Sequence, residues 1–125
     1  MTLALVLFAH GARDPRWAEP FEAVADRIRQ AAPSLLVRLA FLELMAPTLA
    51  DAVDALATAG ATTVDVVPLF LGTGGHVRQD LPLLVDAVRA AHPGLAIRLH
   101  GTIGEDAAVL DAMARAALDA AGFGE

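Results

Sequence analysis

The residues best suited to chemistry in this sequence are His10, Glu43 and His76. The chain has no cysteine, so a metal ion would have to be held by histidine, aspartate, glutamate or water. Two imidazoles and one carboxylate form a ligand set suited to zinc, iron, cobalt or nickel rather than calcium or magnesium. A neutral imidazole can also accept a proton near pH 7. The two histidines are too far apart in the sequence for any short metal motif, so the fold must bring them together.

Each of these three side chains also has an ordinary structural interpretation. His10 could hydrogen-bond a backbone group at the end of a strand. Glu43 lies among apolar neighbours in "LAFLELMAP", where a buried charge needs a partner, and a salt bridge to an arginine would supply one. His76 lies in the glycine-rich stretch "GTGGHVRQ", which fits either a flexible loop or a backbone that approaches a ligand closely.

Arginine residues flank both histidines. Arg13 and Arg16 follow His10, and Arg78 follows His76. Guanidinium groups bind carboxylates in bidentate fashion, so these arginines could form a local positive collar for an anionic ligand. Each of them could equally be an ordinary exposed arginine.

The hydrophobic pattern predicts four strands, each followed by a helix. Leu3–Ala9 is a continuous aliphatic run, typical of a parallel strand that is covered on both faces. The other predicted strands are Leu35–Leu42, Thr63–Leu71 and Leu95–Leu99. Four helices are predicted: one from Pro15 onward, one from Pro47 to Gly60, one capped by Asp80, and one from Glu105 to Ala121. Pro68 would interrupt the third strand and indicates a bulge near its end.

This alternation indicates an α/β fold, a three-layer sandwich on a four-stranded parallel sheet with right-handed crossovers. At 125 residues the chain is the size of a single domain, residues 1–125. Ligands of open parallel sheets bind beyond the carboxyl ends of the strands. The residues that fall at this edge are His10, Glu43, His76 and His100. His92 falls at the opposite edge, and we expect it to be a solvated surface residue.

The composition argues against several classes of function. The formal net charge is −6, and all nine basic residues are arginines, so a nucleic-acid partner is not expected. Without lysine the chain can form neither a Schiff base nor a phosphate-binding loop of the Walker type. No apolar run approaches the roughly 18 residues that span a bilayer. The first residues also lack the pattern of a signal peptide, so we expect a cytoplasmic protein with no membrane partner.

Four segments of the chain resemble the class II chelatases of the short sirohydrochlorin chelatase type, cobaltochelatases or ferrochelatases that insert a divalent metal into a tetrapyrrole. The segments are "AHGARDPRW", "LAFLELMAPTL", "VVPLFLGTGGHVRQDLP" and "HPGLAIRLHGTIGED". They cover most of the length in order, and the third is quite specific. Long members fuse two chelatase-like domains, and this chain resembles the half-length kind.

The resemblance implies a role for each candidate residue. His10 and His76 would be the catalytic histidines, Glu43 would complete a metal site with them, and Arg13 and Arg78 would bind the acidic substrate. The expected substrates are sirohydrochlorin or a related tetrapyrrole and Co²⁺, Fe²⁺ or Ni²⁺, with no organic cofactor. Size and resemblance together predict a homodimer. The chain departs from the family pattern after the His-Gly pair, where a serine is common and alanine stands here, so any hydrogen bond made there is lost.

Three hypotheses of function arise from these residues. The first is a chelatase, a lyase of cobalamin or sirohaem biosynthesis. The alternative is a non-catalytic carrier of a tetrapyrrole or a metal with the same fold. The third is a phosphate-ester enzyme that uses His10, because "AHGARD" faintly resembles the R-H-G motif of histidine phosphatases, although Ala9 stands where that family has its arginine.

Overall fold

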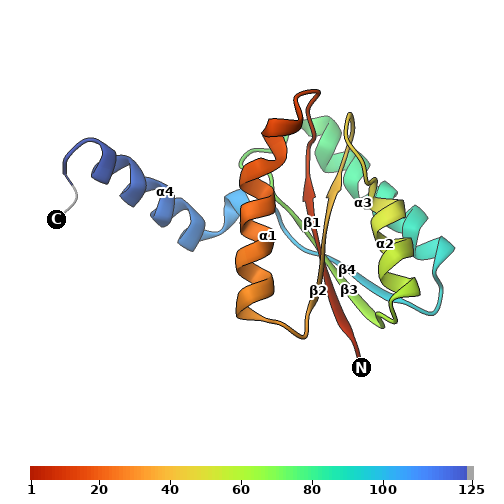
Figure 1. The fold of residues 1–125 in the computed structure, drawn as a ribbon. Helices are drawn as coiled ribbons and strands as arrows, with labels where there is room; N and C mark the ends of the chain where they lie inside the picture. Colours follow the sequence, from red (N-terminus) through yellow and green to blue (C-terminus); the bar gives the residue numbers. More distant parts are fainter. Residues whose placement is uncertain (124–125) are drawn as a thin grey trace.

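The computed structural model describes residues 1–123, in which strands and helices alternate along the chain (Figure 1). The elements in chain order are β1 (Leu3–Ala9), the 3₁₀ turn η1 (Pro15–Ala18), α1 (Glu19–Ala31), β2 (Leu36–Phe41), α2 (Leu49–Thr58), β3 (Thr63–Pro68), α3 (Gly75–Ala91), β4 (Ala96–Leu99), the 3₁₀ turn η2 (Ile103–Glu105) and α4 (Ala107–Ala120). The predicted repetition of strand and helix is confirmed. None of the helices within residues 1–123 is long and apolar enough to span a membrane.

The four strands form one parallel sheet in the order β2-β1-β3-β4. The aliphatic strand β1 lies between β2 and β3, with Ala9 opposite Phe41 and Phe8 opposite Pro68. Helices lie on both faces of the sheet, which confirms the predicted α/β class and its four-stranded parallel sheet (Figure 1). The carboxyl ends of β1, β2 and β3 therefore lie along one edge, which we call the rim.

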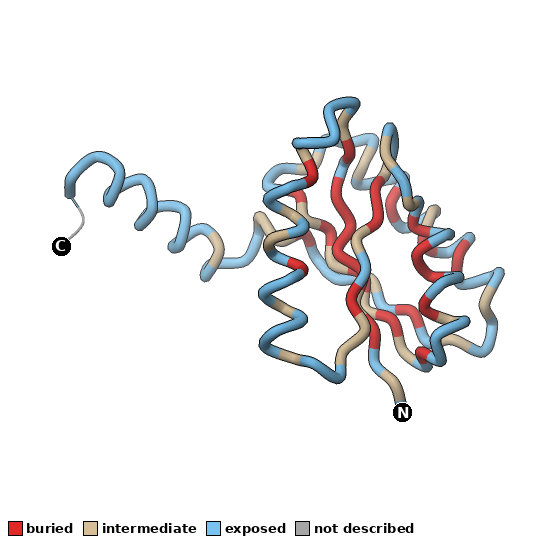
Figure 2. Tube along the Cα trace, in the orientation of Figure 1, coloured by how far each residue is buried: buried red, intermediate tan, exposed pale blue. Residues whose placement is uncertain are grey.

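The helices α2 and α3 cover one face of the sheet and enclose the main core. Val6, Phe8 and Val66 point to this face and are fully buried. Leu56 of α2 and Val85 of α3 are fully buried against them. Figure 2 shows the buried residues concentrated on the central strands and on the inner sides of these helices. The packing of this face holds β1 and β3 in place below the rim.

The helix α1 covers only part of the opposite face. Ala25 of α1 is fully buried beside Leu7 and Val37, on β1 and β2. Within residues 1–123, α1 makes no substantial contact with β3 or β4. The helix α4 does not cover these strands either, because it projects away from the sheet and is exposed along nearly its whole length (Figures 1 and 2). The third layer is therefore incomplete over β3 and β4.

The prediction of a bulge at Pro68 was wrong. The register between β1 and β3 runs without a break from Leu3 opposite Thr63 to Phe8 opposite Pro68. Pro68 is the last residue of β3, and its nitrogen faces the side of β4, which has already ended at Leu99. The proline therefore costs the sheet no ladder hydrogen bond, which explains why it is tolerated in an interior strand.

The start of the third helix also differs from the prediction. The helix α3 begins at Gly75 with Gly74 as its N-cap, so Asp80 lies inside the helix and does not cap it. Pro82 lies inside the same helix. Sequence patterns place a helix start just before a proline because proline is favoured in the first turn. Here packing of Leu81, Val85 and Val88 against the sheet keeps the longer helix together despite the missing hydrogen bond.

His92 is not the solvated residue that the sequence predicts. Its Nε2 lies 2.6 Å from Oδ1 of Asp54 on α2, and its side chain is only 20% exposed. This pair ties the loop before β4 to α2, at the edge of the sheet opposite the rim. His92 therefore has a structural partner far from the candidate site.

Candidate functional site

The rim brings His10 and Glu43 into direct contact. His10 follows β1 and Glu43 follows β2, and His10 Nε2 lies 3.0 Å from Glu43 Oε1. The two side chains are 47% and 55% exposed. Within residues 1–123, Glu43 forms no salt bridge with an arginine, the alternative that the sequence left open, and its carboxylate is not buried. Adjacent strand ends thus deliver an imidazole and a carboxylate to one solvent-accessible point.

Gly11 allows the two strand ends to approach so closely. Its φ is +99°, and a Cβ atom there would lie 1.9 Å from the carbonyl oxygen of Glu43. The backbone nitrogen of Glu43 donates to the carbonyl oxygen of His10 at 3.1 Å, so the two segments continue side by side past the sheet. Only glycine combines this backbone conformation with this contact.

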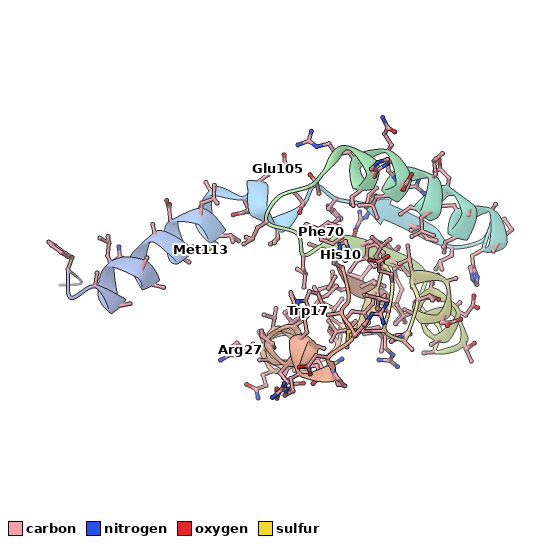
Figure 3. The ribbon with its side chains drawn as sticks, turned by 90° about the horizontal axis from the view of Figure 1, so that it is seen from above. His10, Trp17, Arg27, Phe70, Glu105 and Met113 are labelled. Carbon is pink, nitrogen blue, oxygen red and sulfur yellow. The ribbon has the colours of Figure 1, made fainter. Side chains whose placement is uncertain are left out.

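Phe70 supports the imidazole from the third strand end. Its ring lies edge-on to that of His10, with centroids 6.2 Å apart and planes at 70°, and the two are neighbours in Figure 3. Phe70 is 7% exposed. The sequence analysis missed this residue, although an aromatic side chain just past a strand that ends at the rim is a detectable signal. Its ring restricts the orientations that His10 can adopt.

Leu44 lies beside Glu43 in an unusual backbone conformation. Its φ is 65°, the only positive value among the non-glycine residues described, and the residue is 57% exposed. A γ-branched residue in this conformation is strained, and such strain is concentrated at ligand-binding sites. The structure therefore presents an exposed apolar side chain next to the His10–Glu43 pair.

His76 lies in the first turn of α3 and not in a loop, and it is exposed. Within residues 1–123, no group of three or more histidine, aspartate and glutamate side chains lies close enough together to hold a metal ion. The structure therefore joins two of the three predicted ligands, His10 and Glu43, and leaves His76 apart from them. Its place at the start of a helix that follows β3 keeps it on the rim side of the sheet.

The three arginines of the predicted collar have different surroundings. Arg16 donates from Nε and Nη2 to both carboxylate oxygens of Asp14, and this hydrogen bonding holds the pKa of Asp14 below its usual value. Arg13 and Arg78 are exposed, and neither forms an ion pair with any described residue. The predicted collar is thus reduced to these two, which remain available to an acidic ligand.

A second histidine lies at the end of β4. His100 Nε2 lies 2.7 Å from Oδ1 of Asp65, and Arg98 donates to both oxygens of the same carboxylate, at 2.7 and 2.9 Å. Arg98, with a smaller effect of His100, holds the pKa of Asp65 below its usual value, while burial opposes the shift. His100 and Arg78 also line a cavity of about 170 Å³ between β4 and α3.

A parallel α/β sheet with a histidine–carboxylate pair at its carboxyl edge defines a class of protein able to move protons or bind a metal ion at that edge. The chain belongs to the CbiX family, whose family model matches residues 4–120. This match confirms the resemblance that the sequence segments indicate.

The most similar proteins include enzymes and structures of the same family. A sirohydrochlorin cobaltochelatase of Methanosarcina acetivorans is 35% identical over 80 residues, 64% of this chain and 62% of that protein. A crystal structure of a cobalamin biosynthesis CbiX protein from Marinobacter aquaeolei superposes with a TM-score of 0.84 at 32% identity and covers 96% of this chain and 98% of that one.

The sirohydrochlorin chelatase SirB of Bacillus subtilis is a longer relative. Its structures with Fe³⁺ and with cobalt each superpose with a TM-score of 0.81 at 28% identity. They cover 95% of this chain but only 47% and 51% of SirB. This chain thus spans about half of SirB and about three fifths of the Methanosarcina enzyme.

Proposed function

We propose that this protein is a sirohydrochlorin chelatase, a lyase that inserts Co²⁺ or Fe²⁺ into sirohydrochlorin for cobalamin or sirohaem biosynthesis. The observation that carries the proposal is the contact between His10 Nε2 and Glu43 Oε1 at the ends of adjacent strands. Membership of the CbiX family and the names of its relatives support this reaction. Cobalt and iron are favoured because SirB structures contain them, and an imidazole and a carboxylate would also accept Ni²⁺.

Metal insertion requires the ring to lose two pyrrole protons while the cation sheds its water. With Nε2 protonated, His10 donates to Glu43 and keeps the Nδ1 lone pair free to accept a pyrrole proton or bind the cation. The carboxylate fixes the imidazole and strengthens it as a base, as a carboxylate does for metal-bound histidines. Each accepted proton then passes to solvent, because both side chains are about half exposed.

His76 is proposed as the second catalytic histidine and the third metal ligand. Because it is separate from His10 and Glu43 in the structure, we expect a metal or a tetrapyrrole to draw the three together. The exposed Arg13 and Arg78 would bind acidic side chains of the macrocycle. Leu44 would contact the face of the ring.

We also propose that the working form is a homodimer, since a large flat macrocycle needs a second wall beside the shallow rim. This chain covers about half of the length of SirB, so SirB is long enough to contain a second unit of this size. The cytoplasmic location and the extent of the domain, residues 1–125, stay predictions.

The test is metal insertion into sirohydrochlorin, followed by absorbance with Co²⁺, Fe²⁺ and Ni²⁺ in turn. We expect His10→Ala to lower kcat by roughly 100-fold or more and His76→Ala by a similar factor, the usual range for loss of a general base. His92→Ala is the matched control, because that histidine is bound to Asp54 at the opposite edge. Near-normal turnover in both rim variants would refute the assignment of these residues.

The same assay separates the chelatase from a carrier. Tight binding of sirohydrochlorin by the unmodified chain, without metal insertion above the uncatalysed rate, would favour a non-catalytic carrier of the same fold. No binding of sirohydrochlorin and no metal dependence would refute both.

A further inference from the structure

Thr102, in the linker between β4 and α4, is the one polar residue that is buried within residues 1–123. Its side-chain hydroxyl lies within hydrogen-bonding distance of the carbonyl oxygens of Phe70 and Pro68, and the contact with Phe70 is the shorter. Burying a hydroxyl costs free energy unless it is hydrogen-bonded, and the carbonyl of Phe70 supplies that bond. The hydroxyl thus ties the linker to the segment that follows β3.

Gly104 strengthens this tie. Its nitrogen donates to the same carbonyl oxygen of Phe70 at 2.9 Å, and a Cβ atom built on it would lie 2.0 Å from the carbonyl oxygen of Leu71. Of the glycines in the described part of the chain, only Gly104 and Gly11 have an atom from elsewhere in the chain within 4 Å of such a Cβ. Residues 102–104, which we call the clasp, therefore lie tightly against the backbone that follows β3.

Phe70 connects the clasp to the candidate site. The register that pairs Phe8 of β1 with Pro68 of β3 continues past the sheet, where the nitrogen of Leu69 donates to the carbonyl oxygen of Phe8 at 2.8 Å. Phe70 therefore lies beside His10, with ring centroids 6.2 Å apart (Figure 3). Its ring also lies edge-on to that of Phe8, which is fully buried in the main core. The core thus holds the ring of Phe70, and the clasp holds its backbone.

The imidazole of His10 depends on its neighbours for its orientation, because its side chain is 47% exposed. Glu43 contacts the imidazole at Nε2, and the ring of Phe70 borders it on the side of β3. If the backbone of Phe70 shifted, the imidazole would gain room to rotate away from Glu43. A displacement of about 1 Å in a reacting group can lower a rate by roughly 100-fold. The hold of the clasp on Phe70 therefore bears on the reactive pair.

We propose that Thr102 is a positioning residue for His10. Its hydroxyl fixes the backbone of Phe70, and the ring of Phe70 keeps Nε2 of His10 directed at Glu43. The partners of the hydroxyl are backbone carbonyls, so its effect on His10 passes through Phe70. The effect on turnover rests on the proposed function, whereas the orientation of His10 is measured without any reaction.

The first experiment measures metal insertion by two variants of Thr102. Thr102→Val removes the hydroxyl and keeps the shape of the side chain, whereas Thr102→Ser keeps the hydroxyl. Thr102→Val should lower kcat roughly tenfold and change KM for sirohydrochlorin by less than about twofold, because misplacing His10 slows the reaction without removing a substrate contact. Thr102→Ser should restore kcat to within about twofold of the wild type, since the bond to Phe70 can still form.

Thr62→Val is the matched control for the loss of the hydroxyl. The hydroxyl of Thr62 also donates to a backbone carbonyl, that of Thr2 at 3.1 Å, but at the edge of the sheet opposite the rim. The same substitution there should leave kcat and KM unchanged. An equal loss of kcat in Thr62→Val and Thr102→Val would show a general effect on the fold and would overturn the positioning role.

The second experiment follows the orientation of His10 by nuclear magnetic resonance. The ring current of Phe70 displaces the proton resonances of an imidazole that packs against it, and His10→Ala identifies which of the four histidine signals belongs to His10. Phe70→Leu should remove this displacement, and Thr102→Val should reduce it. Thr102→Ser and Thr62→Val should leave the resonance of His10 where it is in the wild type.

The two experiments together separate the positioning role from the proposed function. A lower kcat for Thr102→Val with an unmoved His10 resonance, or a moved resonance with the kcat of the wild type, would overturn the positioning role. Thr102→Ala lacks the same hydroxyl and replaces Thr102→Val in both measurements if the valine variant does not fold. If the wild type inserted no metal while the His10 resonance still moved in Thr102→Val, the proposed function would fail and the positioning of His10 would stand.

Discussion

His10 and His100 each follow a strand and contact a carboxylate, and the two contacts differ in what else binds that carboxylate. His10 lies 3.0 Å from Glu43 at the ends of β1 and β2, and His100 lies 2.7 Å from Asp65 on β4 and β3. Asp65 also accepts two hydrogen bonds from a guanidinium, and its side chain is 22% exposed. The carboxylate of Glu43 is 55% exposed, and within residues 1–123 His10 is its only side-chain partner.

The difference separates a structural network from a reactive pair. Both oxygens of Asp65 are already occupied, and the positive charge of Arg98 is balanced there, so the network positions β4 beside β3. Glu43 keeps an oxygen and the imidazole keeps a lone pair for an incoming cation or proton. The two histidine–carboxylate distances are similar, but we expect the two contacts to have different functions. The feature that distinguishes them is Arg98, which binds only Asp65.

The largest effect should come from the glycine that lets the reactive pair form. Gly11→Ala would place a methyl group against the carbonyl oxygen of Glu43 at a φ of +99°. We expect the free energy of unfolding to fall by about 3 kcal/mol from strain and overpacking. Metal insertion should fall by roughly 100-fold or more, because His10 and Glu43 would be pushed apart. Urea denaturation and the insertion assay measure the two effects.

Gly72→Ala is the matched control for this substitution. Gly72 lies in the loop before α3, and nothing lies within 4 Å of a Cβ atom built there. The unfolding free energy of Gly72→Ala should stay within about 0.5 kcal/mol of that of the wild type. If both variants behaved alike, the close approach at Gly11 would not be what organises the site.

A smaller effect is expected from removing one charge in each histidine–carboxylate contact. Glu43→Gln should lower the rate of metal insertion or the affinity for cobalt by roughly 10- to 100-fold, the range seen when the partner of a metal-binding histidine is lost. Asp65→Asn should change the insertion rate by less than about threefold, because Arg98 already binds both oxygens of Asp65 and leaves that carboxylate no free oxygen for a proton or a cation. An equal loss of activity in both variants would remove the distinction between the two contacts.

The sequence predicted the parts of this arrangement that depend on chain order. Four alternating apolar runs were enough to place His10 and Glu43 at one edge, and adjacent strands brought them together. The hydrogen bonds from Arg98 to Asp65 and the conformation of Leu44 depend on strand register and packing, which no local pattern encodes. Phe70 was missed although its place just past a strand could have been detected in the sequence. The start of α3 was missed because local rules favour a proline in the first turn, whereas packing extended the helix to Gly75.

The smallest effect concerns the response of the Asp65 network to acid. Because Arg98, with a smaller effect of His100, holds the pKa of Asp65 below its usual value of 3.8, the network stabilises the folded protein fully above that value. This contribution is lost as the pH falls from 3.8 through the lower pKa of the folded state. Urea denaturation measures the unfolding free energy at pH 7 and at pH 2.5. Between these two values of pH, the unfolding free energy of Asp65→Asn should decrease by about 1 kcal/mol less than that of the wild type. Arg98→Gln should also reduce the decrease of unfolding free energy at acid pH, since it removes the main cause of the lowered pKa of Asp65. If the unfolding free energy of both variants decreased with acid as much as that of the wild type, the network would contribute nothing to stability.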